Sequence, residues 1–131
     1  ALMGTPYEIQ TAGKILFLED VGEAPYRVDR MLATLKLAGK FDHVAGILLG
    51  GFSRRKDEAP WDDEWSMDDV LQDYFAKLNV PVLAHFPAGH GPFNATLPIG
   101  AAAELDATAG TVRLLENPVR MPTPSTAKKH R

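Results

Sequence analysis

Three short apolar runs alternate with two amphipathic segments in this 131-residue chain. The runs at 14–20, 43–52 and 81–86 have the length and composition of buried strands. The segments at 23–39 and 66–79 carry apolar residues at helical spacing. Alternating strands and helices predict parallel strands joined by right-handed crossovers, because that hand packs each helix back onto the sheet. The sequence therefore predicts an α/β fold with a small parallel sheet.

The first predicted helix has clear signals at both ends. Pro25 suits its first turn and Gly39 suits its C-terminal cap. Four residues make its predicted apolar face: Val28, Met31, Leu32 and Leu35.

The second predicted helix begins with a different signal. Ser66, followed three residues later by Asp69, resembles a capping box. Four residues share its predicted apolar face: Val70, Leu71, Tyr74 and Leu78.

The pattern changes towards the C-terminus. Residues 99–116 form two alternating runs around a turn at 108–110, which predicts an antiparallel hairpin. We expect this hairpin to add an antiparallel layer to the parallel sheet and its helices. The length predicts one domain, at 1–117, and the Pro-rich, basic composition of 118–131 predicts a disordered tail.

Composition excludes several classes of function. The chain has no cysteine, hence no disulfide, thiolate zinc site or cysteine nucleophile. Its net charge of -3 and lack of a basic stripe predict no nucleic-acid partner. No apolar run reaches the length of a membrane span, so we expect no membrane partner. The first residues do not resemble a natural start, and we expect the chain to begin inside a longer protein.

Candidate chemistry gathers where the predicted strands end. Parallel sheets collect functional groups at the carboxyl edge. Three segments are predicted there: Glu19 with Asp20 at the end of the first run, a Gly-Gly turn at 50–51 that ends the second, and Gly89 with His90 after the third. A carboxylate beside an imidazole fixes its tautomer and stabilises the imidazolium, as a general base requires. The alternative is that Glu19 is a cap or turn residue and His90 is simply exposed.

No serine has the context of a nucleophile. Such a serine usually sits in a Gly-x-Ser-x-Gly elbow. Ser53 has arginine where the second glycine should be, Ser66 is a predicted helix cap, and Ser125 lies in the predicted tail.

A metal site is a rival use of the same residues. His85 and His90 could act as ligands together with the acids of 57–64. However, His85 falls in a predicted apolar strand and the acids in a predicted solvated loop, so we expect no metal and no other cofactor.

Three motifs together resemble LD-carboxypeptidases, the serine peptidase family that also contains the microcin immunity proteins. They are "LFLEDVGEAPYRVDRML" at 16–32, "GGF" at 50–52 and "AGHGPFNATLPIG" at 88–100. Their order and spacing are similar to those of the C-terminal domain of these enzymes. The resemblance covers 4–116.

This resemblance implies a swivelling β/β/α domain and a Ser-Glu-His triad. Glu19 falls on the family's glutamate and His90 on its histidine. The serine is implied to lie in an N-terminal α/β domain outside this chain, which alone would be inactive. The family removes the terminal D-alanine from muropeptide tetrapeptides during cell-wall recycling in the cytoplasm, without a metal and commonly as homodimers.

Other residues near these motifs have less specific interpretations. Arg27 and Arg30 suit salt bridges more than a substrate carboxylate, and Glu23 suits a cap or solvent. Asp20 stays open between these roles and a place in the site. The segment that carries His90 after the third predicted strand is called the histidine loop below. Three residues are expected to shape it: Asn94, Leu97 and Pro98.

Two alternative functions remain. One is a binding or dimerisation module that keeps the fold without turnover. The other is a microcin-immunity-type hydrolase, with the same triad acting on a different amide.

Overall fold

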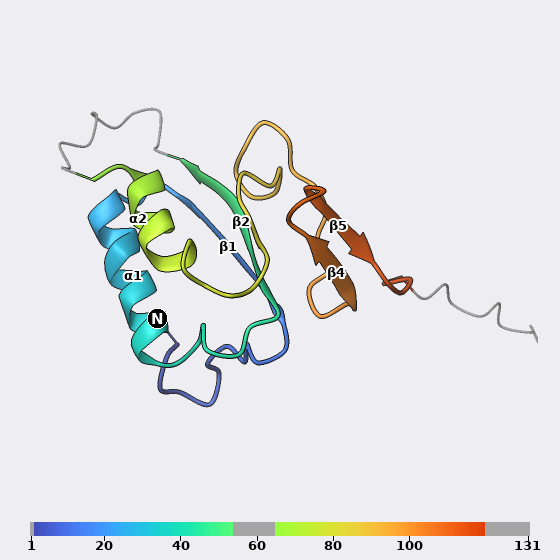
Figure 1. Cartoon of the computed structure of the whole chain (residues 1–131), viewed down its shortest axis with the longest axis horizontal. Helices are drawn as coiled ribbons and strands as arrows, with labels where there is room; N and C mark the ends of the chain where they lie inside the picture. The colour runs from blue at the N-terminus through green and yellow to red at the C-terminus, as the bar shows by residue number, and fades with distance from the viewer. Residues whose placement is uncertain (1, 54–64, 120–131) are drawn as a thin grey trace, which may run out of the picture.

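The computed structural model describes residues 2–53 and 65–119. A parallel sheet with the strand order β1-β2-β3 lies beside two helices, and a separate two-stranded antiparallel sheet follows (Figure 1). This confirms the predicted α/β class. The elements are β1 (Ile15–Val21), α1 (Pro25–Leu37), β2 (Gly46–Ser53), α2 (Met67–Phe75), β3 (Val82–Leu83), β4 (Ala103–Asp106) and β5 (Thr111–Leu114).

The molecule has three layers in the predicted β/β/α order. In Figure 1, α1 and α2 lie side by side against one face of the parallel sheet, and the β4–β5 hairpin lies on its other side. A Cβ atom added to Gly46 would lie 2.9 Å from Cδ2 of Leu105, so the hairpin packs closely against β2. The predicted turn is confirmed, and Oδ1 of Asp106 accepts hydrogen bonds from the N–H groups of Thr108 and Ala109.

The hydrophobic core lies between the helices and the parallel sheet. Its buried side chains are Leu16, Val28, Leu32, Phe41, Val44, Ile47, Leu49, Val70, Leu71 and Phe75. Met31 was predicted on the apolar face of the first helix but is 46% exposed, whereas Val28 and Leu32 are buried and Leu35 is partly buried against the core. Phe75 was missed, although it is 2% exposed and its ring centroid lies 5.3 Å from that of Phe41.

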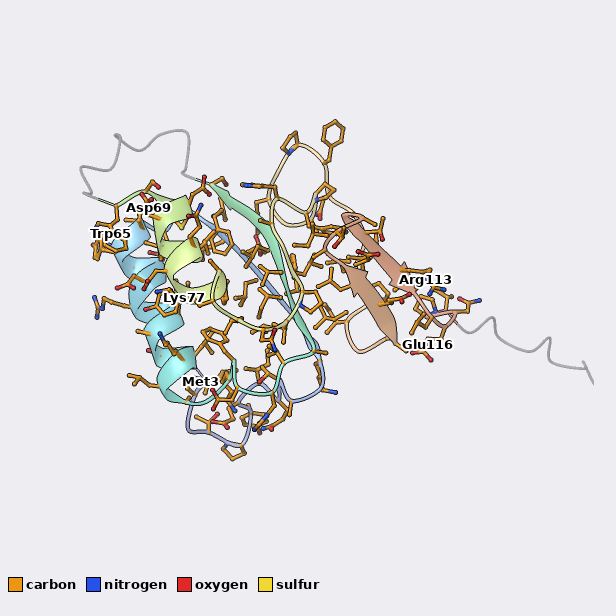
Figure 2. All side chains as sticks on the ribbon, viewed as in Figure 1. Met3, Trp65, Asp69, Lys77, Arg113 and Glu116 are labelled. Atoms are coloured by element: carbon orange, nitrogen blue, oxygen red, sulfur yellow. The ribbon has the colours of Figure 1, made fainter. Side chains whose placement is uncertain are left out.

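The helix ends follow the predicted signals. Pro25 opens α1, and Gly39 follows it with φ at +69°, where a residue without a Cβ atom is favoured. Ser66 and Asp69 form the predicted capping box, and Asp69 lies at the start of α2 in Figure 2. However, α2 ends at Phe75 rather than continuing to 79.

The third predicted strand is shorter than expected. β3 covers only Val82–Leu83, and His85, which was predicted to lie in this strand, adopts a positive φ of 56° that interrupts it. Pairing with β2 resumes at Phe86, whose N–H donates to the carbonyl of Leu49. His85 is therefore an exposed residue at a kink, not a packed strand residue.

The Gly-Gly pair predicted as a turn lies inside a strand. β2 runs through Gly50 and Gly51 to Ser53. Leu18 pairs with Leu49 and Asp20 with Phe52. Two residues of β2, Gly50 and Gly51, therefore lie opposite the single residue Glu19 of β1. This extra residue on β2 is a β-bulge.

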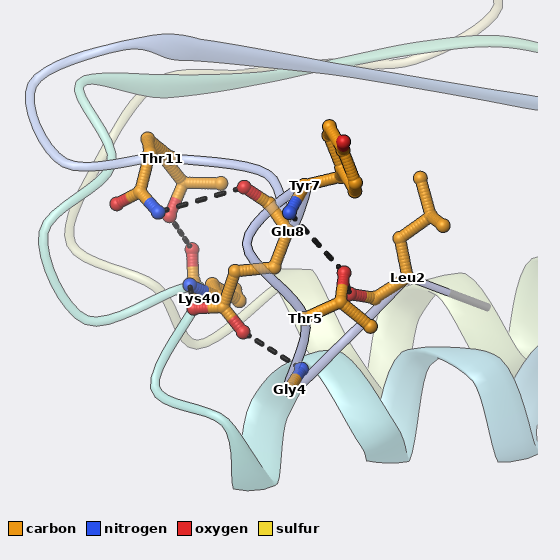
Figure 3. A network of polar contacts seen from close by, with 8 residues as sticks. Leu2, Gly4, Thr5, Tyr7, Glu8, Thr11 and Lys40 are labelled. Atoms are coloured by element: carbon orange, nitrogen blue, oxygen red, sulfur yellow. Dashed lines mark hydrogen bonds and ion pairs between the residues drawn. The ribbon is translucent and has the colours of Figure 1, made fainter.

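The segment before β1 is tied to the loop after α1. The ammonium of Lys40 lies 2.8 Å from Oε1 of Glu8, and the hydroxyl of Thr11 donates to the carbonyl of Lys40 (Figure 3). Glu8 also accepts from the N–H of Gly4. The hydrogen bond from Lys40, followed by the one from Gly4, lowers the pKa of the Glu8 carboxyl.

Parts of two predictions lie outside the described residues. They are the solvated acidic loop, at 54–64, and most of the disordered tail, at 120–131. The domain boundary at 117 stays a prediction. Within the described ranges, no helix has both the length and the apolar character needed to cross a membrane.

Candidate functional site

Glu19 lies near the carboxyl end of β1, at the bulge. In the pairing of β1 with β2, Gly50 and Gly51 lie opposite it. The side chain of Glu19 is 26% exposed, which leaves it half-buried at the rim of the sheet.

His90 reaches the same rim on the loop that follows β3. This loop first runs along β2, where the N–H of Gly51 donates to the carbonyl of Ala88 at 3.2 Å. Ala88 is 4% exposed and anchors the loop. Figure 1 shows the chain after β3 passing beside the end of β2 before it reaches the hairpin. Since β2 lies between β1 and β3, His90 meets Glu19 only because the loop crosses β2 at the bulge.

The two predicted site residues are in contact. Nδ1 of His90 lies 3.0 Å from Oε2 of Glu19, which is hydrogen-bond distance. The predicted approach of these side chains is therefore confirmed, whereas their catalytic role stays a prediction.

The geometry assigns different tasks to the two ring nitrogens. A carboxylate oxygen accepts a hydrogen bond, so the Nδ1 atom that faces it carries the proton. The lone pair of a neutral ring is then on Nε2. The His90 side chain is 61% exposed, so a group arriving from outside the described residues can reach it. The pair can therefore perform general acid–base chemistry at Nε2.

Asp20 shapes the turn after β1. Its Oδ1 atom accepts from the N–H of Glu23, three residues later, at 3.1 Å, so the Asp20 side chain closes the turn before α1. Burial raises the pKa of the Asp20 carboxyl. Glu23 forms an ion pair with Arg27 at 3.2 Å, which confirms the salt-bridge interpretation of that arginine.

Asn94 closes the histidine loop, as predicted. Its Oδ1 atom accepts from the N–H of Gly89 at 3.0 Å. Next to it, the N–H of Ala95 donates to the carbonyl of Pro87 at 2.6 Å. These two bonds fix both sides of His90.

Among the described residues, the rival candidates form no site. In the described part of the chain, no group of three or more His, Cys, Asp or Glu side chains could hold a metal ion. The predicted acidic ligands at 57–64 lie outside it. Ser53 is exposed at the end of β2, Ser66 caps α2, and Ser125 lies outside the described residues.

Sequence reasoning missed a cavity of about 310 Å³ between α2 and the strands β2 and β3. Its lining includes Leu49, Phe52, Leu71, Phe75, Val82 and His85. His85, at the kink after β3, lines this cavity, and no periodic pattern in the sequence predicts the cavity.

Sequence reasoning also missed how the glycines act. The "GG" and "GHG" motifs predict where a strand ends and a loop follows. Only the fold shows which atoms occupy the space that a side chain at these glycines would fill. A Cβ atom on Gly89 would lie 2.7 Å from Oε2 of Glu19, and one on Gly50 would lie 2.5 Å from the carbonyl oxygen of Ala88.

Known proteins are similar to this chain in sequence. The model of the family described as LD-carboxypeptidase C-terminal domain matches residues 1–105. A Synechocystis protein named as a carboxypeptidase is 43% identical over 113 residues, covering 86% of this chain and 37% of that protein. The murein tetrapeptide carboxypeptidase of Pseudomonas aeruginosa is 38% identical over 97 residues, covering 72% of this chain and 30% of that protein. The chain thus spans about a third of the length of these relatives.

Solved structures show the same fold. The crystal structure of muramoyltetrapeptide carboxypeptidase from Oxalobacter formigenes superposes with a TM-score of 0.71 at 36% identity, covering 86% of this chain and 39% of that one. The microcin C7 self-immunity protein MccF superposes with a TM-score of 0.72 at 25% identity, covering 91% of this chain and 35% of that one.

Proposed function

The chain belongs to the LD-carboxypeptidase C-terminal domain family, and on that premise we propose that it is the C-terminal catalytic part of a serine LD-carboxypeptidase. The substrate of the intact protein is a muropeptide tetrapeptide, from which the enzyme releases the terminal D-alanine during cell-wall recycling in the cytoplasm. The contact between Nδ1 of His90 and Oε2 of Glu19 carries this proposal, because it prepares the imidazole as a base.

His90 moves the proton in both halves of the reaction. Its Nε2 atom takes the proton from the serine hydroxyl as the serine oxygen attacks the peptide carbonyl. It then gives that proton to the nitrogen of the departing D-alanine as the C–N bond breaks. A water molecule, deprotonated by the same nitrogen, releases the acyl group in the second half.

Glu19 orients the ring and stabilises its charged form. As Nε2 gains a proton the imidazole becomes a cation, and the adjacent carboxylate lowers the energy of that state. The Glu19 carboxylate therefore contributes most to catalysis when both ring nitrogens of His90 are protonated.

The proposed N-terminal domain supplies what this chain does not. It carries the serine and the donors of the oxyanion hole, which stabilise the negative charge on the tetrahedral intermediate. Relatives more than twice as long as this chain support a further domain. We also propose that the intact enzyme forms a homodimer.

A second candidate function is hydrolysis of a microcin-type amide. The structural match to the microcin C7 self-immunity protein, which was solved with aspartyl sulfamoyl adenosine, favours it. A non-catalytic binding module of the same fold is the third candidate.

Release of free D-alanine from an L,D-tetrapeptide separates these candidates. The assay compares the intact protein, this 131-residue chain alone and the chain mixed with the separately produced N-terminal domain. We expect release by the intact protein and none by the chain alone. An intact protein that cleaves only aspartyl sulfamoyl adenosine would favour the second candidate, and one that cleaves neither would favour the binding module. D-Alanine release by this chain alone would overturn the proposed division of the triad.

A further inference from the structure

We propose that Gly50 and Gly89 are positioning residues that set the distance between Glu19 and His90. This inference rests on the proposed function for its effect on catalysis, but the contact itself is tested separately below.

Gly89 leaves the space that the Glu19 carboxylate occupies. A Cβ atom at Gly89 would lie 2.7 Å from Oε2 of Glu19 and 3.2 Å from its Cβ and Cδ atoms. Real Cβ atoms essentially never come within 3.0 Å of another heavy atom, so the carboxylate would have to move. The oxygen that would be displaced is the one in contact with His90. Gly89 also has φ at +105°, which disfavours any residue with a side chain.

Gly50 leaves the space through which the histidine loop crosses β2. A Cβ atom at Gly50 would lie 2.5 Å from the carbonyl oxygen of Ala88 and 2.9 Å from the ring of Phe17. The ring belongs to β1 and the carbonyl to the loop, and Gly50 is itself buried in the strand between them. A side chain here would lift Ala88, and with it His90 two residues later.

Gly51 and Gly91 provide matched controls in the same two segments. Gly51 is the other glycine of the bulge, and a Cβ atom there would have no heavy atom within 4 Å. Gly91 follows His90, and a Cβ atom there would lie 3.6 Å from the carbonyl oxygen of Phe93, an ordinary contact. Neither has a positive φ. A role limited to general flexibility would therefore make Gly50, Gly51 and Gly91, none of which has a positive φ, similarly sensitive.

The catalytic test compares Gly89→Ala and Gly50→Ala with Gly51→Ala and Gly91→Ala in the intact protein. A displacement of about 1 Å at a catalytic group can cost roughly 10²-fold in rate. We expect a loss of kcat of that order in the first two variants, with KM little changed, because the substrate's binding groups stay in place. The two control variants should keep kcat near the wild-type value. Wild-type kcat in Gly89→Ala, or an equal loss in Gly51→Ala, would overturn the inference.

A second measurement does not depend on catalysis. Nitrogen-15 NMR of labelled histidine in the 131-residue chain reports which ring nitrogen of His90 carries the proton. In Gly89→Ala the His90 signals should move to those of Glu19→Gln, which lacks the carboxylate, while Gly91→Ala should keep the wild-type signals. Wild-type signals in Gly89→Ala would overturn the inference. Should His90→Ala leave the intact protein fully active, the proposed function would fail, and the NMR result would still decide the positioning role. If Gly50→Ala does not fold, Gly89→Ala alone carries both tests.

Discussion

His90 contacts Glu19 through Nδ1 at 3.0 Å, although 71 residues separate the two along the chain. Their strands are not neighbours, because β2 lies between β1 and β3. The contact depends on a loop that crosses β2 at Gly50, where a Cβ atom would collide with the carbonyl oxygen of Ala88. This one relationship links the unusual glycine content of the motifs to a pair of groups suited to proton transfer.

Replacing the two proposed catalytic residues should reduce turnover of the intact protein to different extents. His90→Ala removes the base, and members of a triad act as a unit, so kcat for D-alanine release should fall on the order of 10⁴-fold. Glu19→Gln should cost less, because the amide still fills the space and can hydrogen-bond to Nδ1, although it no longer fixes the tautomer or stabilises the imidazolium. Circular dichroism should show both variants folded, since both side chains lie at the rim of the sheet. Full activity in His90→Ala would contradict the assignment.

The face around the site should bind the proposed N-terminal domain. Phe93, three residues after His90, is 77% exposed, and Val21 at the end of β1 is 41% exposed. Apolar side chains gathered at one edge are typical of a surface that a partner covers. Phe93→Ser should therefore weaken binding of the separately produced domain, measured by calorimetry. Leu37→Ser is the control: Leu37 is 89% exposed at the last residue of α1, and its replacement should leave binding unchanged. Equal weakening by both variants would argue against an interface at this edge.

The ion pair between Glu8 and Lys40 should stabilise the fold in a pH-dependent way. The pKa of Glu8 is lowered in the folded protein, so its contribution is fully present above its ordinary value of 4.5 and is lost as the pH falls through the lowered value. At pH 7, Glu8→Gln should therefore lower the melting temperature, and the difference from wild type should shrink on acidification. Asp73→Asn is the control, because the pair of Asp73 with Lys77 is longer, at 4.0 Å, and more exposed. A melting-temperature difference that does not change with pH would contradict this role of Glu8.

The core should depend on Phe75 far more than on Met31. Phe75→Ala would empty a site between α2 and Phe41, and truncation of a buried phenylalanine costs about 3–5 kcal/mol of the free energy of unfolding. Met31→Ala removes a side chain that is 46% exposed, and its cost should be well below 1 kcal/mol, since exposed substitutions usually change stability by less than about 0.5 kcal/mol. Urea unfolding of both variants measures the difference. Similar costs would place Met31 in the core after all.

Local sequence patterns are sufficient to predict the features that depend on residues close together in the chain. The order of strands and helices follows from apolar runs and helical spacing. The ends of α1 and the start of α2 follow from Pro25, Gly39 and the Ser66–Asp69 capping box. The hairpin follows from alternation around a turn. The carboxyl-edge rule also brought Glu19 and His90 to one rim, because it depends only on strand direction.

Other features depend on contacts between distant segments, and the folded structure was needed to find them. The kink at His85 interrupts β3 in a run whose composition predicts continuous strand. Gly50 and Gly51 continue β2 as a bulge, although paired glycines in sequence suggest a turn. Phe75 is buried and Met31 exposed because packing against a particular neighbour, not helical period alone, decides which apolar side chains lose water. The distance between Glu19 and His90 belongs to this second class, because it is set by whether a loop from beyond β3 can pass over β2 without meeting a Cβ atom.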